Sequence, residues 1–293
     1  MVSFQKFNEA FWSLVMPWQM LYMSLAYLPG TISHLYKTSG LTAILSWKRV
    51  QDAWFSRFWS FWGPRIRIGR GHYIVALLEG RVTQARIGKD VVMPPVNGTV
   101  LDIGPGRGYW VDLYGKTDVP VGKEAVSSKK AITKVYGVEP NADSWPSLRQ
   151  KVKDAGLDGI YEILPVGIEA ISAASPDGTA HIEKGSVDCI VSVLCLCSIP
   201  DQEKNIKELY GYLKEGGRWY LYEHVVANKY WPMRLYQAFV NVFWPYAYGG
   251  CQLCKDTRGS LENAGKWSKI DIAQPPEEQW HFTVPHIFGT FTK

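Results

Sequence analysis

The feature that most constrains this chain is a glycine-rich turn that directly follows an apolar segment. The apolar residues within 99–103 indicate the end of a buried strand, and this strand closes on Asp102. Glycines then follow at every second position, as Gly104, Gly106 and Gly108. Glycine lets a backbone pass closely beneath a ligand that side chains would exclude. The turn therefore predicts a site for an extended, nucleotide-like ligand at the end of this strand.

The spacing of these glycines separates two kinds of nucleotide-binding turn. Dinucleotide-binding proteins use G-x-G-x-x-G, whose third glycine allows close packing of helix on strand and whose helix N-terminus faces a pyrophosphate. In this chain Tyr109 occupies the position of that third glycine, and the pattern is G-x-G-x-G after an acid. The spacing therefore disfavours an NAD-type oxidoreductase.

Further apolar segments follow at the spacing of alternating strands and helices. A helix is predicted over 201–214, with Asp201 as its N-cap and Gly216-Gly217 at its end. Alternation of this kind requires parallel strands, right-handed crossovers and a ligand crevice at the carboxyl ends of the strands. We expect a doubly wound, mostly parallel α/β sheet of seven strands, over 99–103, 135–140, 161–169, 186–194, 218–222, 267–272 and 285–291.

Carboxylates follow two of these strands at the predicted ligand edge. Glu139 ends the second strand, where it is placed to accept hydrogen bonds from both ribose hydroxyls of a nucleoside. Glu169 lies at the exit of the third strand and is predicted to lie near an adenine amine, with Ile168 packed on the ring. A solvated carboxylate is the alternative for each acid. The polar stretch 115–130 is expected to be an inserted loop.

The first 80 residues differ in character from the rest of the chain. No Lys, Arg, Asp or Glu occurs between Ala10 and Tyr36, a length that would cross a bilayer, but Pro17 and many aromatics are typical of an interfacial segment. The following stretch 47–70 mixes cations with large aromatics, which suits either anionic lipid or a lid that packs on the core. We expect a helical, aromatic-rich membrane-associating or lid segment over 1–80, retained and not cleaved as a signal peptide, and a ligand-binding domain over 81–293.

Charge and cysteine usage exclude several classes of partner. The net charge of +5 is modest and its excess lies largely in the aromatic block, so we expect no nucleic acid partner. Five cysteines in a chain of this length indicate a reducing compartment. Cys251 and Cys254 with Cys195 and Cys197 would supply four thiolates, but the glycines and polar residues of a zinc knuckle are missing. We therefore expect buried small hydrophobic residues and no metal.

Three segments after the fourth strand complete a resemblance to a known family. They are LCSIP at 196–200, EHV at 223–225 and GCQL at 250–253, and the closing VPHIFG at 284–289 agrees with them. With the G-x-G-x-G turn, they resemble class I methyltransferases that use S-adenosyl-L-methionine (SAM), and in particular the membrane-anchored thiol methyltransferases of the methyltransferase-like family and their fungal relatives. The resemblance implies a Rossmann-like sheet, SAM as cofactor and a small lipophilic acceptor. It also implies a membrane-associated protein on the cytosolic face of the endoplasmic reticulum or a lipid droplet.

The strand ends and the resemblance together give the predicted cofactor-binding residues. They are Asp102, Gly104, Pro105, Gly106, Gly108, Glu139, Pro140, Ile168, Glu169, Ser192 and Leu194.

The resemblance favours S-methylation of a thiol as the reaction. O- or N-methylation in secondary metabolism, and SAM binding without methyl transfer, remain alternatives. A phenol or alcohol acceptor would profit from a general base, for which His224 after the fifth strand is the first candidate and His286 the second. A histidine held by hydrogen bonds beside the cofactor is the alternative for each. The aromatic segment 230–248 is predicted to form a lipophilic wall for the acceptor.

Overall fold

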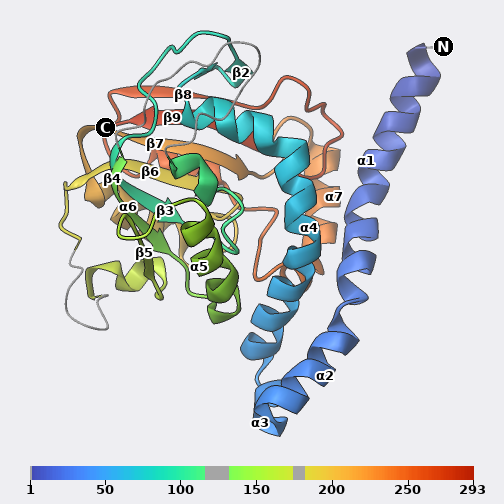
Figure 1. Ribbon diagram of the computed structural model, residues 1–293. Coiled ribbons are helices and arrows are strands. Elements are labelled where there is room, and N and C mark those ends of the chain that lie inside the picture. The colour runs from blue at the N-terminus through green and yellow to red at the C-terminus, as the bar shows by residue number, and fades with distance from the viewer. Residues whose placement is uncertain (1, 116–131, 174–181) are drawn as a thin grey trace.

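Seven strands form one twisted sheet at the centre of the molecule (Figure 1). The computed structural model describes residues 2–115, 132–173 and 182–293. The order across the sheet is β5-β4-β3-β6-β7-β9-β8. The strands are β3 (Gly98–Ile103), β4 (Ile132–Val138), β5 (Tyr161–Leu164), β6 (Val187–Val193), β7 (Leu213–His224), β8 (Lys269–Ala273) and β9 (His286–Thr292). The five neighbouring strands β5, β4, β3, β6 and β7 pair in parallel. Strand β9 runs antiparallel to both β7 and β8. The predicted doubly wound, mostly parallel sheet is confirmed.

Alternate residues of the strands are buried on opposite faces of the sheet. Val100 packs in the same apolar cluster as Leu77 and Leu148, whereas its neighbour Leu101 packs in a second cluster with Leu209. This is the period of two that a β-strand requires, with both faces covered by helices. The covering helices are α4 (Trp47–Leu78), α5 (Trp145–Asp154), α6 (Gln202–Tyr212) and α9 (Thr257–Glu262), with short 3-10 helices η1 (Val111–Tyr114), η2 (Ala142–Ser144) and η3 (Ile168–Ala173).

The boundary between α6 and β7 differs from the prediction. Asp201 has a left-handed backbone (φ 39°) and its side chain makes no capping hydrogen bond, because an N-cap side chain reaches the helix only from an extended backbone. The helix ends at Tyr212, and Gly216-Gly217 lie inside β7. There they exchange backbone hydrogen bonds with Lys293, so that the glycines pair with the end of the chain. The loop predicted over 115–130 lies, beyond Gly115, outside the described residues.

The N-terminal segment is helical and folds back on itself. Helices α1 (Val2–Leu25), α2 (Leu28–Ser39) and α3 (Leu41–Leu45) lead away from the sheet and α4 returns to it, so that α4 lies between α1 and the core (Figure 1). A small hairpin, β1 (Val82–Thr83) and β2 (Arg86–Ile87), follows. Helices α7 (Trp231–Asn241) and α8 (Trp244–Ala247) pack beside α1. Within the described ranges, no helix has the length and apolarity that a membrane span needs.

Candidate active site

A cavity of about 440 Å³ opens at the carboxyl edge of the sheet, where the predicted ligand crevice lies. The turn after β3, the loop after β4, the start of η3, the loop after β6 and one face of α4 form its walls. Eight of the eleven predicted cofactor residues line it: Gly104, Pro105, Gly106, Glu139, Pro140, Ile168, Glu169 and Leu194. The geometry therefore brings most of the predicted site together, although the role of each residue stays a prediction.

The first two glycines of the turn are required for different reasons. Both have a left-handed backbone, with φ of 64° at Gly104 and 55° at Gly106. A Cβ atom on Gly104 would lie 2.3 Å from the sulfur of Cys195, so this glycine is required for packing inside the protein. A Cβ atom on Gly106 would meet no atom within 4 Å. Gly106 therefore faces the open space that a ligand would fill.

Glu139 is the buried carboxylate of the cavity. Its Oε2 accepts a hydrogen bond from the backbone N–H of Gly106, and its Oε1 accepts one from the N–H of Asn141, each at 2.8 Å. Burial nevertheless raises the pKa of this carboxyl to about 7, although the two backbone donors act in the opposite direction. Each carboxylate oxygen of Glu139 can accept one further hydrogen bond. Two adjacent hydroxyl groups on a ligand could donate these two hydrogen bonds.

Three predicted cofactor residues lie behind the cavity wall. Asp102 accepts a hydrogen bond from the Tyr161 hydroxyl at 2.8 Å, and burial raises its pKa to about 6. A Cβ atom on Gly108 would contact Lys151 at 3.0 Å, so this glycine lets α5 approach the turn. Ser192 accepts a hydrogen bond from the Trp219 indole at 3.0 Å. In this structure, these residues hold the turn and the sheet edge from beneath.

Neither predicted catalytic histidine lines the cavity. The two residues are paired in register at one end of β7 and β9 and are both buried. Nε2 of His224 lies 3.2 Å from the sulfur of Cys251, and Nδ1 of His286 lies 2.5 Å from a Glu278 oxygen. Burial lowers the pKa of His286. The geometry agrees with the alternative of histidines held by buried partners, and a role as general base stays a prediction for both.

Helix α4 supplies a wall of the cavity, which the sequence offered only as one of two alternatives for 47–70. Its lining residues recur every three or four positions, as Lys48, Gln51, Asp52, Phe55, Ser56, Trp59, Gly63 and Ile66. This is the spacing of one helical face, which is the signal that would have found it. The arrangement is the lid alternative for 47–70, and it leaves contact with lipid open for the rest of the segment.

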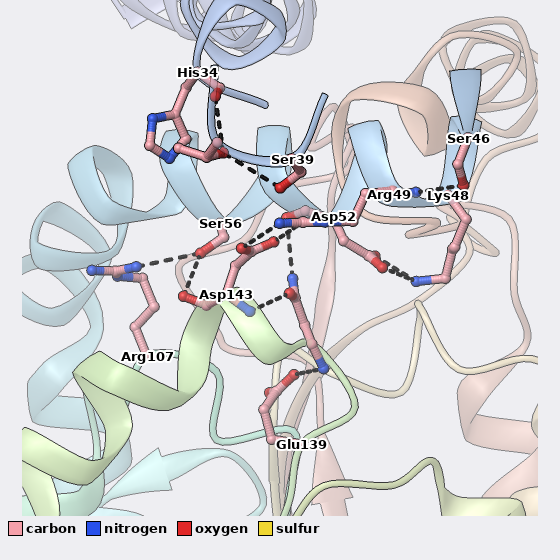
Figure 2. Close-up of polar contacts among 12 residues, drawn as sticks. His34, Ser39, Ser46, Lys48, Arg49, Asp52, Ser56, Arg107, Glu139 and Asp143 are labelled. Carbon is pink, nitrogen blue, oxygen red and sulfur yellow. Dashed lines mark hydrogen bonds and ion pairs between the residues drawn. The ribbon is translucent and has the colours of Figure 1, made fainter. Parts of the chain in front are cut away.

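Polar contacts fasten α4 to the loop that follows Glu139 (Figure 2). The Arg49 guanidinium makes a two-pronged ion pair with the carboxylate of Asp143. The Ser56 hydroxyl donates to the backbone oxygen of Asp143 at 3.2 Å, and the Asn141 amide donates to the backbone oxygen of Asp52 at 3.1 Å. The helix and the loop that carries the buried acid are therefore held as one unit.

Tyr109 joins α4 to the glycine turn. Pro64 lies inside α4 and has no N–H, which leaves the carbonyl of Ser60 without its helical donor. The Tyr109 hydroxyl faces this carbonyl at 3.4 Å and that of Trp59 at 3.2 Å. A Cβ atom on Gly63 would lie 2.1 Å from the Tyr109 ring, so only glycine leaves room for it. Tyr109, which occupies the position of the third glycine in the dinucleotide pattern, thus offers a hydrogen-bond donor to the carbonyl that Pro64 leaves without one.

The aromatic segment 230–248 does not form the predicted acceptor wall. Within the described chain, no residue of α7 or α8 lines the cavity, which this region reaches only through Gly249 and Gly250. Tyr236 and Phe239 of α7 contact Trp18 of α1 instead. The Trp18 indole donates to the Tyr236 oxygen at 2.7 Å, and the Trp18 and Phe239 rings are 5.5 Å apart.

The strand order, the glycine turn and the acid after β4 define a class I methyltransferase fold. Residues 81–264 match a family model described as a methyltransferase domain. Because this match covers more than half of the chain, the protein belongs to the methyltransferase-domain family.

Two curated relatives resemble the chain over part of their length. Human thiol S-methyltransferase TMT1A is 32% identical over 144 residues, covering 47% of this chain and 56% of the relative. Human thiol S-methyltransferase TMT1B is 34% identical over 128 residues, covering 43% and 51%. The chain thus matches about half the length of these relatives.

Two solved structures show the same fold over almost the whole chain. An O-methyltransferase family protein from Burkholderia thailandensis gives a TM-score of 0.52 at 12% identity, covering 96% of this chain and 71% of that one. The trans-methyltransferase CalH, in complex with SAH, gives a TM-score of 0.50 at 13% identity, covering 97% and 68%.

SAM is the cofactor of this methyltransferase, and the residues present fit it. Glu139 offers two buried oxygens for the ribose hydroxyls, and Gly106 leaves space above the turn. Ile168 and Leu194 add apolar surface to the same cavity.

Proposed function

We propose that the protein transfers the methyl group of SAM to a small lipophilic acceptor and that the acceptor atom is a thiol sulfur. The observation that carries the proposal is the continuity of one cavity, which runs from the glycine turn to the apolar side chains of α4. Phe55, Trp59 and Ile66 supply that apolar surface opposite the predicted cofactor residues. The similarity to human thiol S-methyltransferases over about half their length supports sulfur as the acceptor atom.

For methyl transfer, the protein must align the acceptor atom with the methyl group of SAM and must exclude water from the site. SAM supplies an electrophilic methyl group, and a direct displacement needs no covalent intermediate on the protein. Glu139 and the turn would fix the donor through its sugar, and Phe55 and Trp59 would exclude water from the acceptor side. A thiol ionises near neutral pH, so a thiolate forms without a dedicated base. For this reason thiol methylation does not depend on moving a buried histidine to the cavity.

Thiol methylation is tested with purified protein, isotope-labelled SAM and matched aliphatic thiols, phenols and amines. We expect methylated thiol products in the mass spectrum, at rates that rise with pH as the thiolate fraction of the acceptor grows. Methylated phenols or amines without thioethers would move the assignment to O- or N-methylation. Bound SAM with no methylated product from any acceptor would leave a SAM-binding protein without transfer.

We also propose that the protein docks on a membrane surface, on the cytosolic face of the endoplasmic reticulum or a lipid droplet. Large apolar side chains are exposed along α1, α2, α3, the first turn of α4 and the segment from α7 to α8. They include Phe11, Trp12, Tyr22, Tyr36, Leu41, Leu45, Trp47, Trp231, Leu235, Phe239, Phe243 and Tyr246. Helices α1 and α7 lie side by side, so these residues come from neighbouring elements (Figure 1). Exposed apolar patches mark membrane or partner contacts, and aromatic rings favour the headgroup level.

The docking surface is tested by placing charge on it. Trp231 and Phe239 of α7 are 74% and 57% exposed. We expect Trp231→Asp with Phe239→Asp to lower cosedimentation with phospholipid vesicles at least tenfold, since burying each side chain is worth roughly 1.5–3 kcal/mol. The control is Ile68→Asp on α4, whose side chain is 83% exposed outside this surface. Equal sedimentation of the double variant and the wild type would remove α7 from the surface.

A further inference from the structure

The three segments that carry the family resemblance meet in one buried cluster beside the cavity. Cys197 follows β6, His224 ends β7, and Cys251 follows α8. Their Sγ and imidazole nitrogen atoms all lie within 4.8 Å of one another, and all three residues are buried. These residues are far apart in the sequence, so the sheet and the segment after α8 create the cluster.

The donor set of this cluster is that of a soft metal ion. Two thiol sulfurs and one imidazole nitrogen are ligands that zinc selects, at about 2.3 Å for sulfur and about 2.0–2.1 Å for nitrogen. Tetrahedral geometry at these lengths places ligand atoms about 3.5–4 Å from one another. The three donor atoms lie within 4.8 Å of one another, and the Cys251 sulfur lies 3.2 Å from Nε2 of His224, a few tenths of an ångström closer than this range. A small adjustment of side chains would admit an ion.

The immediate contacts of the cluster suit a metal bound through the Cys251 sulfur and Nε2 of His224. The Trp244 indole N–H donates to the sulfur of Cys251 at 3.2 Å, a contact that supports negative charge on sulfur. Nδ1 of His224 has no hydrogen-bond partner among the described residues, and Nε2 is the ring nitrogen that faces the Cys251 sulfur.

We propose that Cys197, His224 and Cys251 bind one zinc ion through two sulfurs and Nε2. Three protein ligands leave the fourth tetrahedral position to water, which is the arrangement of zinc sites that keep an open position. Ser198 and Gly250 are chain neighbours of the two cysteine ligands and line the cavity, so the zinc site adjoins it.

The proposal replaces the sequence expectation of no metal. That expectation weighed Cys195 and Cys254 as partners of the other two cysteines, and neither belongs to the cluster of described residues. His224 takes their place, because β7 carries it to the same point. Spacing along the chain does not show that His224 lies beside Cys197 and Cys251.

The test measures metal content in the full chain, purified under reducing conditions from cells supplied with zinc. We expect close to one zinc per chain by elemental mass spectrometry. Cys197→Ser and Cys251→Ser are each expected to lower zinc retention at least tenfold against a chelator. Cys254→Ser is the matched control, since it removes a nearby cysteine outside the cluster and should keep the zinc. Wild-type protein without stoichiometric zinc, before and after incubation with zinc, would overturn the proposal.

Two measurements on the wild type keep the proposal testable if the serine variants unfold. Replacement of zinc by Co²⁺ should give the absorption of a tetrahedral cobalt thiolate, and zinc should slow alkylation of Cys197 and Cys251 but not of Cys254. Absence of both signals would contradict the proposal. A Cys197–Cys251 disulfide in protein isolated with its thiols blocked would also contradict it, since it would show a redox pair instead.

Discussion

Replacement of Gly106 by leucine is expected to weaken SAM binding at least a hundredfold while the protein stays folded. A Cβ atom at this position meets nothing within 4 Å, so the leucine side chain has room only in the cavity that SAM must fill. A hundredfold loss of SAM affinity corresponds to about 2.7 kcal/mol of binding free energy. A side chain that fills the space of SAM is expected to cost at least this much. Isothermal titration of SAM, with circular dichroism as the check on folding, measures both parts of the prediction.

Gly156→Leu is the matched control for this variant. Gly156 has φ of 65° against 55° for Gly106, and a Cβ atom there also meets nothing within 4 Å, but it lies at the exposed end of α5. Both variants carry the same left-handed strain of roughly 1–2 kcal/mol, so the loss of stability should be similar in the two. Only Gly106→Leu should lose SAM. Similar affinities in the two variants would mean that the donor does not lie over the turn.

Glu139→Gln is expected to weaken SAM binding by about tenfold to a hundredfold above pH 8 and to remove its dependence on pH. The wild-type carboxyl titrates at about pH 7 in the protein without ligand, so its ability to accept from two hydroxyls is lost as the pH falls through 7. SAM affinity of the wild type should therefore rise from pH 6 to pH 8. The loss in the variant corresponds to about 1.4–2.7 kcal/mol. Titrations of SAM across this pH range measure both effects.

Without SAM, the pH dependence of stability runs in the opposite direction to that of SAM affinity, and Glu139→Gln is expected to reduce it. Because the pKa of Glu139 is raised in the folded state, its contribution to stability is fully present below the unfolded pKa of about 4.5 and is lost as the pH rises through 7. The fall in unfolding free energy between pH 5.5 and pH 8.5 should be smaller in Glu139→Gln by about 2 kcal/mol. Comparing slopes between the two proteins removes the contributions of Asp102 and Glu223, whose pKa values burial raises to about 6 and about 8.

Glu162→Gln provides the comparison for both experiments on Glu139. Glu162 lies on the neighbouring strand β5 and forms an ion pair with Lys134 at 2.7 Å, both side chains being about one-third exposed. This change should leave SAM affinity and its pH profile as in the wild type. A pH-independent affinity in the wild type itself would show that Glu139 does not contact the donor as a carboxylate.

The sequence was sufficient for the sheet and for the ligand edge. Apolar segments of strand length, each followed by a glycine turn or an acid, placed Gly104, Gly106 and Glu139 at one edge, because parallel strands bring their carboxyl ends together. Eight of the predicted cofactor residues lie on the cavity for this reason.

The wall formed by α4 was harder to locate because its pattern fits two environments. Phe55 and Trp59 recur at helical spacing beside Lys48 and Asp52, and such a stripe suits a lipid surface as well as a cavity. The turn through α2 and α3 decides between them by returning α4 to the sheet. The sequence placed His224 at the ligand edge but could not show that it is covered. Its strand ends at the expected edge, but residues around Cys251 cover it.

The fit of Tyr109 against α4 limits how freely the N-terminal helices can be exchanged between relatives. The ring occupies the space left by Gly63, and its hydroxyl serves the carbonyl that Pro64 leaves open. A chimera that grafts foreign helices onto residues 81–293 must therefore bring a glycine and a matching break in the helix, or replace Tyr109 at the same time. The N-terminal helices can therefore be exchanged only together with a residue at position 109 that fits them.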